Sequence, residues 1–271
     1  MRFRFLIPLT LALALCAQGQ PPHTPGAGIN FYKLDREIAL GAALAEDVRR
    51  ESQVLDSELV QAYVARLGRQ LALQTAGPNF PYAFTAVADL PPGVMTNNPT
   101  HEPMAVPGGP IFIPAGLILE AQSTAELAGM LAHAIAHVAD RDCTRSETRA
   151  DLMQVSASTA PQFRGCWSGE PVAPGSIQFQ HAFERQADYL AVQTMSKAGY
   201  DPAALAAYIR RVKPDPKRAS SPPRAFSPWP TAEERLKQIE HEIGTLPPDR
   251  PYSAGEDIAP IQLALRSLAA K

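Results

Sequence analysis

Basic charge is scarce in this sequence, and its scarcity excludes one class of binding partner. The 271 residues contain 25 Lys and Arg against 27 Asp and Glu, which gives a formal net charge of −2 at pH 7. Affinity for a phosphate backbone needs a clustered basic surface. Aromatic residues make up only 7% of the chain, so no platform for stacking single-stranded bases is apparent. We therefore exclude nucleic acid as a partner.

Cysteines, long apolar runs and internal repeats are also scarce or absent. The three cysteines form no C-x-x-C pair, which excludes the metal and redox motifs built on that spacing. Beyond the N-terminus, no apolar run reaches the ~20 residues that a transmembrane helix needs. No repeat of fixed period is present, which argues against a solenoid. A globular protein of one or two domains remains, at about 150 residues per domain.

The N-terminal 19 residues have the pattern of a secretory signal peptide. A basic start precedes an apolar run over residues 5–15, and small residues follow near a cleavage point. We expect residues 1–19 to be removed and the mature protein to be periplasmic or extracytoplasmic. Cys16 leaves the alternative of a lipoprotein attached to a membrane through that residue, although Leu15 is larger than a lipobox prefers.

Removal of the signal peptide leaves two cysteines, Cys143 and Cys166. An even number of cysteines in an oxidising compartment predicts one disulfide between them. The alternative is two unrelated buried thiols.

Hydrophobic periodicity predicts a mainly helical α+β chain with a small sheet. Apolar residues recur at helical spacing in segments 35–52, 56–73, 123–142, 177–197, 202–212, 231–243 and 257–271. Alternation over residues 80–88 predicts a strand. Ile111, Phe112 and Ile113 form a second short strand between Pro110 and Pro114. Because proline is tolerated at sheet edges and not in central strands, we expect this strand to lie at an edge.

Two histidines, His133 and His137, lie four residues apart on the predicted helix 123–142. At this spacing both imidazoles leave the same face of a helix, which is the arrangement that zinc takes from two helical ligands. Spacing alone also fits two ordinary histidines on an alanine-rich helix, so both interpretations stay open at this point.

The predicted helix 177–197 carries Glu184 and Asp188, again four residues apart on one face. Glu184 can ligate a metal ion, and Asp188 can accept the free N–H of a ligating histidine and so fix its tautomer. The alternative is a solvated acidic stripe. His181, one turn before Glu184, is either a competing ligand or simply a neighbour.

Five segments, in their order and spacing, resemble the zinc metallopeptidases of family M48, the gluzincins that include HtpX-, BepA- and LoiP-like proteins. The segments are residues 36–41, 105–113, 125–138, 184–202 and 230–236. The resemblance implies a single gluzincin-type metallopeptidase domain over residues 20–243, followed by a tail and helix over residues 244–271. It also implies a zinc ion held by His133, His137 and Glu184, with Asp188 behind them.

The resemblance further implies how a substrate binds. An extended peptide pairs with an edge strand by β-augmentation, and we expect Ile111, Phe112 and Ile113 to form that strand. The implied partners are unfolded or extended envelope proteins, either as substrates or as clients.

The sequence departs from the family at two catalytic positions. Family members carry a glutamate directly after the first histidine, and this glutamate is the general base that deprotonates the metal-bound water. The residue here is Ala134, which cannot accept a proton. Family members also carry a histidine before a later proline, where it stabilises the oxyanion. Alignment on Pro230 and Arg235 places Trp229 there, and an indole has one N–H donor and no cationic form.

These departures predict a pseudopeptidase that keeps its zinc ligands and has lost its general base. Loss of a positioned base typically costs about 10²–10⁴ in rate. The alternatives are an active metalloendopeptidase that recruits Asp140, Asp142 or Glu102 through a bridging water, and a metal-free chaperone or binding module.

Overall fold

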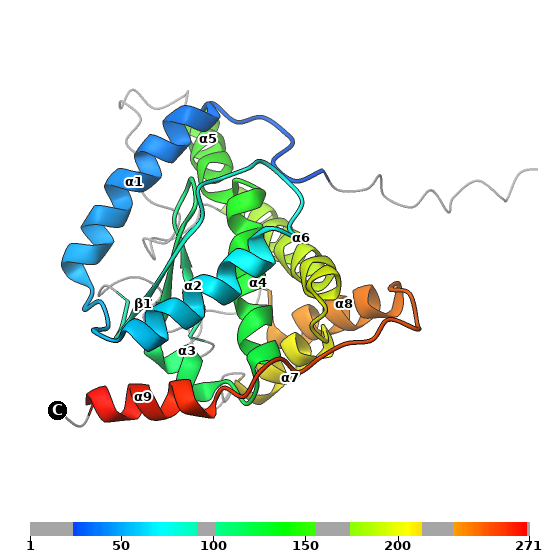
Figure 1. The fold of residues 1–271 in the computed structure, drawn as a ribbon. Helices are drawn as coiled ribbons and strands as arrows, with labels where there is room; N and C mark the ends of the chain where they lie inside the picture. The colour runs from blue at the N-terminus through cyan, green and yellow to red at the C-terminus, as the bar shows by residue number, and fades with distance from the viewer. Residues whose placement is uncertain (1–23, 91–100, 155–173, 213–229, 270–271) are drawn as a thin grey trace, which may run out of the picture.

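The structure, a computed structural model, describes residues 24–90, 101–154, 174–212 and 230–269 (Figure 1). The helices in these ranges are α1 Leu34–Glu51, α2 Glu58–Ala72, α3 Ala115–Glu120, α4 Thr124–Ala139, α5 Asp142–Gln154, α6 Pro174–Ala198, α7 Ala203–Val212, α8 Ala232–Gly244 and α9 Ala259–Ala269. The strands are β1 Ala83–Val87, β2 Met104–Ala105 and β3 Pro110–Pro114. The predicted fold class, a mainly helical α+β chain with a small sheet, is confirmed.

Helix α4 forms the centre of the fold. All of its residues except His137 are buried, as expected for a helix that is largely apolar on every side. Helices α2, α6 and α7 pack against it, and Figure 1 shows α4 running between α2 and α6. Gly129 permits the close approach of α7, since a Cβ atom there would lie 2.9 Å from the Cβ atom of Leu205. The surrounding core therefore holds α4 and its side chains in place.

The three strands form one sheet in the order β1-β3-β2. β3 is parallel to β1, with Phe84 opposite Ile111, and antiparallel to β2, with Met104 opposite Phe112. The prediction that Ile111–Ile113 is an edge strand is therefore wrong, because β3 lies in the middle. Its prolines are the first and last residues of the strand, where a missing N–H interrupts no central pairing. They mark the ends of β3 and say nothing about its place in the sheet.

The two edges of the sheet differ in how far they are covered. On the outer side of β1, the side-chain amide of Gln61 donates to the carbonyl of Ala86 at 2.9 Å and accepts from its N–H at 2.9 Å. The N–H of Leu55 also donates to that carbonyl, at 3.1 Å. β2 has one strand neighbour, β3. Among the described strands, β2 is therefore the edge at which an extended segment can pair.

Helix α1 rests directly on the loop that joins β2 to β3. A Cβ atom at Gly41 would lie 1.6 Å from the carbonyl oxygen of Pro107, and one at Gly108 would lie 2.6 Å from the Cα atom of Ile38. Gly108 also has a positive φ of 76°, a conformation that glycine adopts without the penalty of a side chain. These two glycines let α1 seat against the sheet and fix the position of β2.

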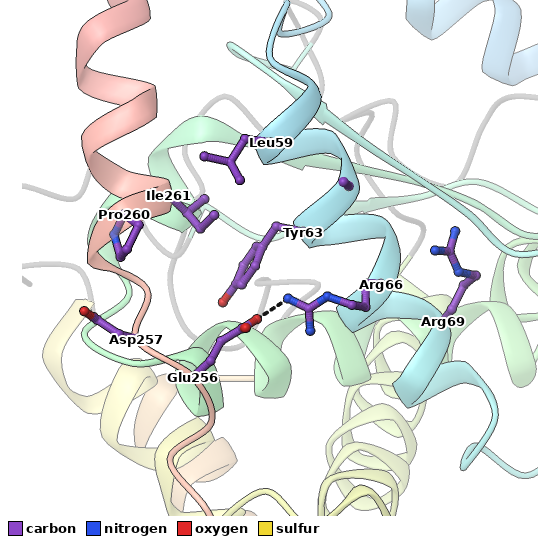
Figure 2. A pocket seen from close by; sticks show the side chains of 9 residues that line it. Leu59, Tyr63, Arg66, Arg69, Glu256, Asp257, Pro260 and Ile261 are labelled. Atoms are coloured by element: carbon purple, nitrogen blue, oxygen red, sulfur yellow. Dashed lines mark hydrogen bonds and ion pairs between the residues drawn. The ribbon is translucent and has the colours of Figure 1, made fainter.

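Helix α9 packs against α2 and α3. Ile258, Ile261 and Leu265 join the main core cluster, and the side-chain amide of Gln262 donates to the carbonyl of Ala121 at 2.8 Å. A groove between α2 and α9 has Tyr63 in its wall (Figure 2). The division predicted at residue 243 stays a prediction.

Three of the predicted features lie outside the described residues: the signal peptide over residues 1–19 with Cys16, the oxyanion position Trp229, and Cys166 of the predicted disulfide. Cys143, the other predicted half of that disulfide, is buried and disulfide-bonded. No helix in the described parts of the chain is both long and apolar enough to cross a membrane.

Candidate metal centre

Helices α4 and α6 bring His133, His137 and Glu184 together, as the sequence analysis expected. The Nε2 atoms of the two histidines lie 3.0 Å apart. The Glu184 carboxylate lies 3.5 Å from Nε2 of His133 and 3.7 Å from Nε2 of His137. A tetrahedral zinc ion with bonds of about 2.0–2.2 Å sets its ligand atoms about 3.3–3.6 Å apart. The three observed separations lie within a few tenths of an ångström of that range, and the three side chains could hold a metal ion.

Two further carboxylates hold the imidazoles from behind. Nδ1 of His133 lies 2.9 Å from Oδ1 of Asp188, on α6. Nδ1 of His137 lies 2.8 Å from Oδ2 of Asp142, at the start of α5. A carboxylate at Nδ1 favours the tautomer with the proton on that atom, which leaves the Nε2 lone pair free for a metal. Two lone pairs and the Glu184 carboxylate then face one another, and only a cation makes that arrangement favourable. The donor set therefore fits zinc.

The pKa values of His133 and Glu184 also show that this centre favours a positive charge. Burial and the Arg235 charge lower the pKa of His133, but the hydrogen bond and charge of Asp188, with Glu184, outweigh them and raise it to about 9. Burial raises the pKa of Glu184, but His137, His133 and Arg235 together lower it to about 2. The centre is therefore built to hold its carboxylate ionised beside a cation.

Arg235, on α8, is the buried counter-charge of this centre. Its Nε and Nη2 atoms donate to the two oxygens of Asp188 at 2.9 and 2.7 Å, and its Nη1 atom donates to Glu102 at 2.7 Å. Burial raises the pKa of Asp188, but Arg235 and His133 lower it well below its usual range. The side chain of Arg235 is 8% exposed. A buried cation thus joins the carboxylate behind His133 to the residues that precede β2.

Asp140 and Asp142, two of the alternative general bases, have other partners. Asp140 is fully buried and accepts from the N–H of Gly26 at 3.1 Å. Asp142 faces Nδ1 of His137, on the opposite side of the ring from Nε2. It therefore points away from the place where the ligand atoms converge. Glu102, the third alternative, is 12% exposed and lies against Arg235.

Ala134 lies in the apolar core, 1% exposed. Ala134 directly follows His133 on α4, and its methyl group offers no polar atom. His181, the competing ligand, does not join the metal-ligating group found among the described residues.

The sequence analysis missed the role of Asp142, because helical periodicity does not predict it. Asp142 is five residues after His137 and belongs to the next helix. Arg141 between the helices has a positive φ of 60°, and this left-handed residue lets α5 begin at once and turn Asp142 back toward His137. Its guanidinium Nε donates to the buried carboxylate of Glu37 at 2.6 Å. A non-glycine residue in this conformation costs about 1–3 kcal/mol, so the surrounding contacts must hold it there.

The role of Arg235 was missed for a different reason. It lies 47 residues from Asp188, on another helix, so no local spacing joins the two. An arginine in the first turn of a helix has no signature of its own. Only its place in a late segment shared with known metallopeptidases could have drawn attention to it.

Comparisons with known proteins agree with this geometry. Peptidase family M48 matches residues 58–243, more than half of the chain. A Vibrio cholerae serotype O1 protein assigned as a beta-barrel assembly-enhancing protease is 27% identical over 254 residues, which cover 87% of this chain and 50% of the relative. The beta-barrel assembly-enhancing proteases of Yersinia pestis and Escherichia coli K12 are 24% and 23% identical, over 83% and 88% of this chain and 47% and 50% of their own lengths. The chain spans about half the length of these relatives.

Proposed function

Because this chain belongs to peptidase family M48, we propose that it is a periplasmic envelope protein with a zinc centre at His133, His137 and Glu184, and that it binds extended or misfolded envelope proteins but cleaves them poorly. The observation that carries this proposal is the pairing of a complete ligand set with Ala134 at the position of the base. The similarity to beta-barrel assembly-enhancing proteases favours unfolded outer-membrane proteins as the clients.

A bound zinc ion would polarise a peptide carbonyl and lower the pKa of a water on its open position. The residues of the chain that act on the ion are its three ligands and the two carboxylates, Asp188 and Asp142, that orient the imidazoles. A base must also remove a proton from the attacking water and return it to the leaving amine. The methyl group of Ala134 can do neither, so the chain can bind and orient a peptide without turning it over efficiently.

An extended client would pair with β2. In an antiparallel ladder, hydrogen-bonded residues alternate with residues whose backbone groups face outward. The N–H of Val106 donates to the carbonyl of Pro110 at 2.8 Å, so the N–H and carbonyl of Ala105 face away from β3. These outward groups supply the main-chain hydrogen bonds that β-augmentation uses.

Glu102 supports the second candidate, an active peptidase with a substitute base. Asp142 faces His137 and Asp140 is fully buried, whereas Glu102 is partly exposed. Its contact with Arg235 works against this role, because the guanidinium already donates a hydrogen bond to the carboxylate. Replacement of Glu102 by Gln would abolish cleavage if this candidate were right.

The test of the main proposal uses the purified full chain and its His137→Ala variant. We expect about one zinc per wild-type chain by elemental analysis, and none in the variant. A fluorogenic extended peptide should bind the wild-type chain, with cleavage near the background of the variant. Robust cleavage that a chelator stops would establish an active peptidase in place of the proposed one. Absence of zinc from both proteins would favour the metal-free binding module.

The client class is tested separately. The zinc-loaded chain is titrated with an unfolded outer-membrane β-barrel protein and with the same protein after folding into detergent. We expect binding to the unfolded form alone. Equal affinity for the two forms, or none for either, would contradict a role with extended clients and would leave the zinc centre intact.

A further inference from the structure

We propose that Arg235 is a positioning residue of the metal centre: it clamps Asp188 in the orientation that aims His133 at the metal, and Glu102 holds the clamp from the side of the sheet. This inference rests on the proposed zinc centre and extends it to residues that touch no ligand atom of the metal. It follows from four contacts that connect His133, Asp188, Arg235 and Glu102.

The first step is the geometry at Asp188. Two nitrogen atoms lie close to Oδ1 of Asp188: Nδ1 of His133 at 2.9 Å and Nη2 of Arg235 at 2.7 Å. Oδ2 receives Nε of Arg235 at 2.9 Å. A planar guanidinium that grips both oxygens of a carboxylate fixes the plane of that carboxylate as well as its position. Asp188 therefore cannot rotate without breaking the fork, and the imidazole that it orients is held with it.

The second step is the burial of the clamp. The side chains of Asp188 and Arg235 are 1% and 8% exposed, so water cannot replace either partner. A buried carboxylate behind a metal-ligating histidine normally finds its own restraint in a further hydrogen bond, and the loss of such outer contacts weakens metal binding. Arg235 is that restraint here.

The third step is the remaining arm of the guanidinium. Nη1 of Arg235 donates to Glu102 at 2.7 Å, two residues before β2 begins. The single cation is thereby shared by two carboxylates from different parts of the fold. Glu102 keeps Arg235 turned toward Asp188 and connects this ion pair to the segment that leads into β2.

A role of Arg235 through its charge and a role through positioning predict opposite effects on zinc affinity, which makes the proposal testable. Nη2 of Arg235 lies 3.4 Å from Nδ1 of His133, so the guanidinium is a positive charge close to the metal centre. If it acted through charge alone, its removal would tighten zinc binding, because like charges repel. If it acts as a positioning residue, its removal weakens zinc binding. Lysine separates the two further, since it keeps the charge and cannot form the fork.

The experiment measures the zinc dissociation constant of the full chain by competition with a chromophoric chelator. The variants are Arg235→Lys, Arg235→Gln and Glu102→Gln. Arg210→Lys and Glu240→Gln are matched controls from an exposed arginine–glutamate pair that joins α7 to α8. We expect zinc binding to weaken about tenfold in Arg235→Lys and by at least that factor in Arg235→Gln. We expect a smaller loss in Glu102→Gln and no change in the controls.

A second readout separates positioning from general damage to the fold. Cobalt(II) replaces zinc, and its visible absorption reports the geometry of the ligands. We expect an altered cobalt spectrum in Arg235→Lys while the unfolding temperature of its metal-free form stays near that of the wild type. If both Arg235 variants fail to fold, the partly exposed Glu102→Gln variant carries the same test.

Three outcomes would overturn the inference. Wild-type zinc affinity and an unaltered spectrum in Arg235→Lys would show that the bidentate contact with Asp188 has no role in metal binding. Tighter zinc binding in Arg235→Gln would show that Arg235 acts only as a repelling charge. If the Arg235 variants do not fold, wild-type zinc affinity in Glu102→Gln would overturn the inference instead. Failure of the wild-type chain itself to bind zinc is a distinct result, which overturns the proposed function first and this inference with it.

Discussion

The Nε2 atoms of His133 and His137 lie 3.0 Å apart, and a separate carboxylate holds the Nδ1 atom of each ring. Two imidazoles restrained in this way cannot turn their lone pairs away from each other. With Glu184 facing both, the polypeptide brings three electron-rich groups together in a buried place. Such a cluster raises the energy of the folded chain unless a proton or a metal ion lies in it, so its presence links folding to cation binding.

Metal binding should therefore be visible as stability. At a zinc concentration 100 times its dissociation constant, a site that exists only in the folded state adds about 2.7 kcal/mol. For a chain of this size, that corresponds to a rise in unfolding temperature of about 5–10 °C. The measurement is a thermal melt with zinc and with a chelator. His137→Ala should melt at one temperature in both, and His241→Ala, an exposed histidine on α8, should behave as the wild type does.

Asp142 gives a second prediction, because its contact with His137 was found only in the structure. Asp142→Asn keeps the shape of the side chain and removes the charge that favours the correct histidine tautomer. We expect zinc affinity to fall about 10–100-fold, measured by competition with a chelator. Asp151→Asn, on the same helix, is the matched control and should change nothing. An unchanged affinity in Asp142→Asn would mean that the negative charge at Nδ1 of His137 does not contribute to zinc binding.

The parts of this protein that the sequence predicted are those governed by local periodicity. Helix α4 was expected over residues 123–142 and is Thr124–Ala139. Its two histidines lie on one face, as their spacing predicted, and the structure shows that this face meets Glu184 and Asp188 of α6. Its end came three residues early because Arg141 adopts a left-handed conformation, which the periodicity of apolar residues does not register.

The parts that the sequence did not predict depend on contacts between distant segments. Pro110 and Pro114 were interpreted as marks of an edge strand, yet β3 is central. Strand order is set by which segments meet across the sheet, and a proline at either end of a strand is compatible with any position. The Arg235 contact has the same character, since nothing near Arg235 in sequence records that Asp188 and Glu102 converge on it.

The buried pair of Glu37 and Arg141 predicts a dependence on pH. Burial raises the pKa of Glu37 above its usual value of 4.5, although the hydrogen bond and charge of Arg141 lower it. The folded chain therefore holds this proton more tightly than the unfolded chain does. The stability that the neutral group contributes is complete below the unfolded pKa and is lost as the pH rises through the folded pKa.

Arg141→Ala should deepen that loss, because it removes the groups that lower the pKa of Glu37. We expect a cost of about 3–5 kcal/mol in the free energy of unfolding near neutral pH, as for other broken buried ion pairs, and a smaller cost below pH 4.5, where Glu37 is neutral in both states. Urea unfolding at the two pH values measures it. In the Glu37→Gln background the pH dependence of the Arg141→Ala cost should disappear. An equal cost at both pH values would show that Arg141 acts through packing.

The sheet edge gives a prediction about client binding. Because the backbone groups of Ala105 face away from β3, Ala105→Pro removes an outward N–H donor and leaves the pairing of β2 with β3 intact. We expect an extended peptide to bind about two- to tenfold more weakly, in line with the loss of one main-chain hydrogen bond from a strand pairing. Ala105→Ser keeps the donor and should bind as the wild type does. Fluorescence anisotropy of a labelled peptide measures both, and equal binding by the two variants would place the client elsewhere.

The position of Ala134 gives the sharpest prediction about catalysis. If the ligand set is complete and only the base is missing, Ala134→Glu should raise zinc-dependent cleavage of a fluorogenic peptide by about 10² or more. Ala134→Gln adds nearly the same volume without a proton acceptor, so it should show no gain. Both variants place a large polar side chain at a position that is 1% exposed, and both should lose stability. The difference between them therefore isolates the proton transfer from the packing. Equal activity in the two variants would mean that the chain lacks more for catalysis than its general base.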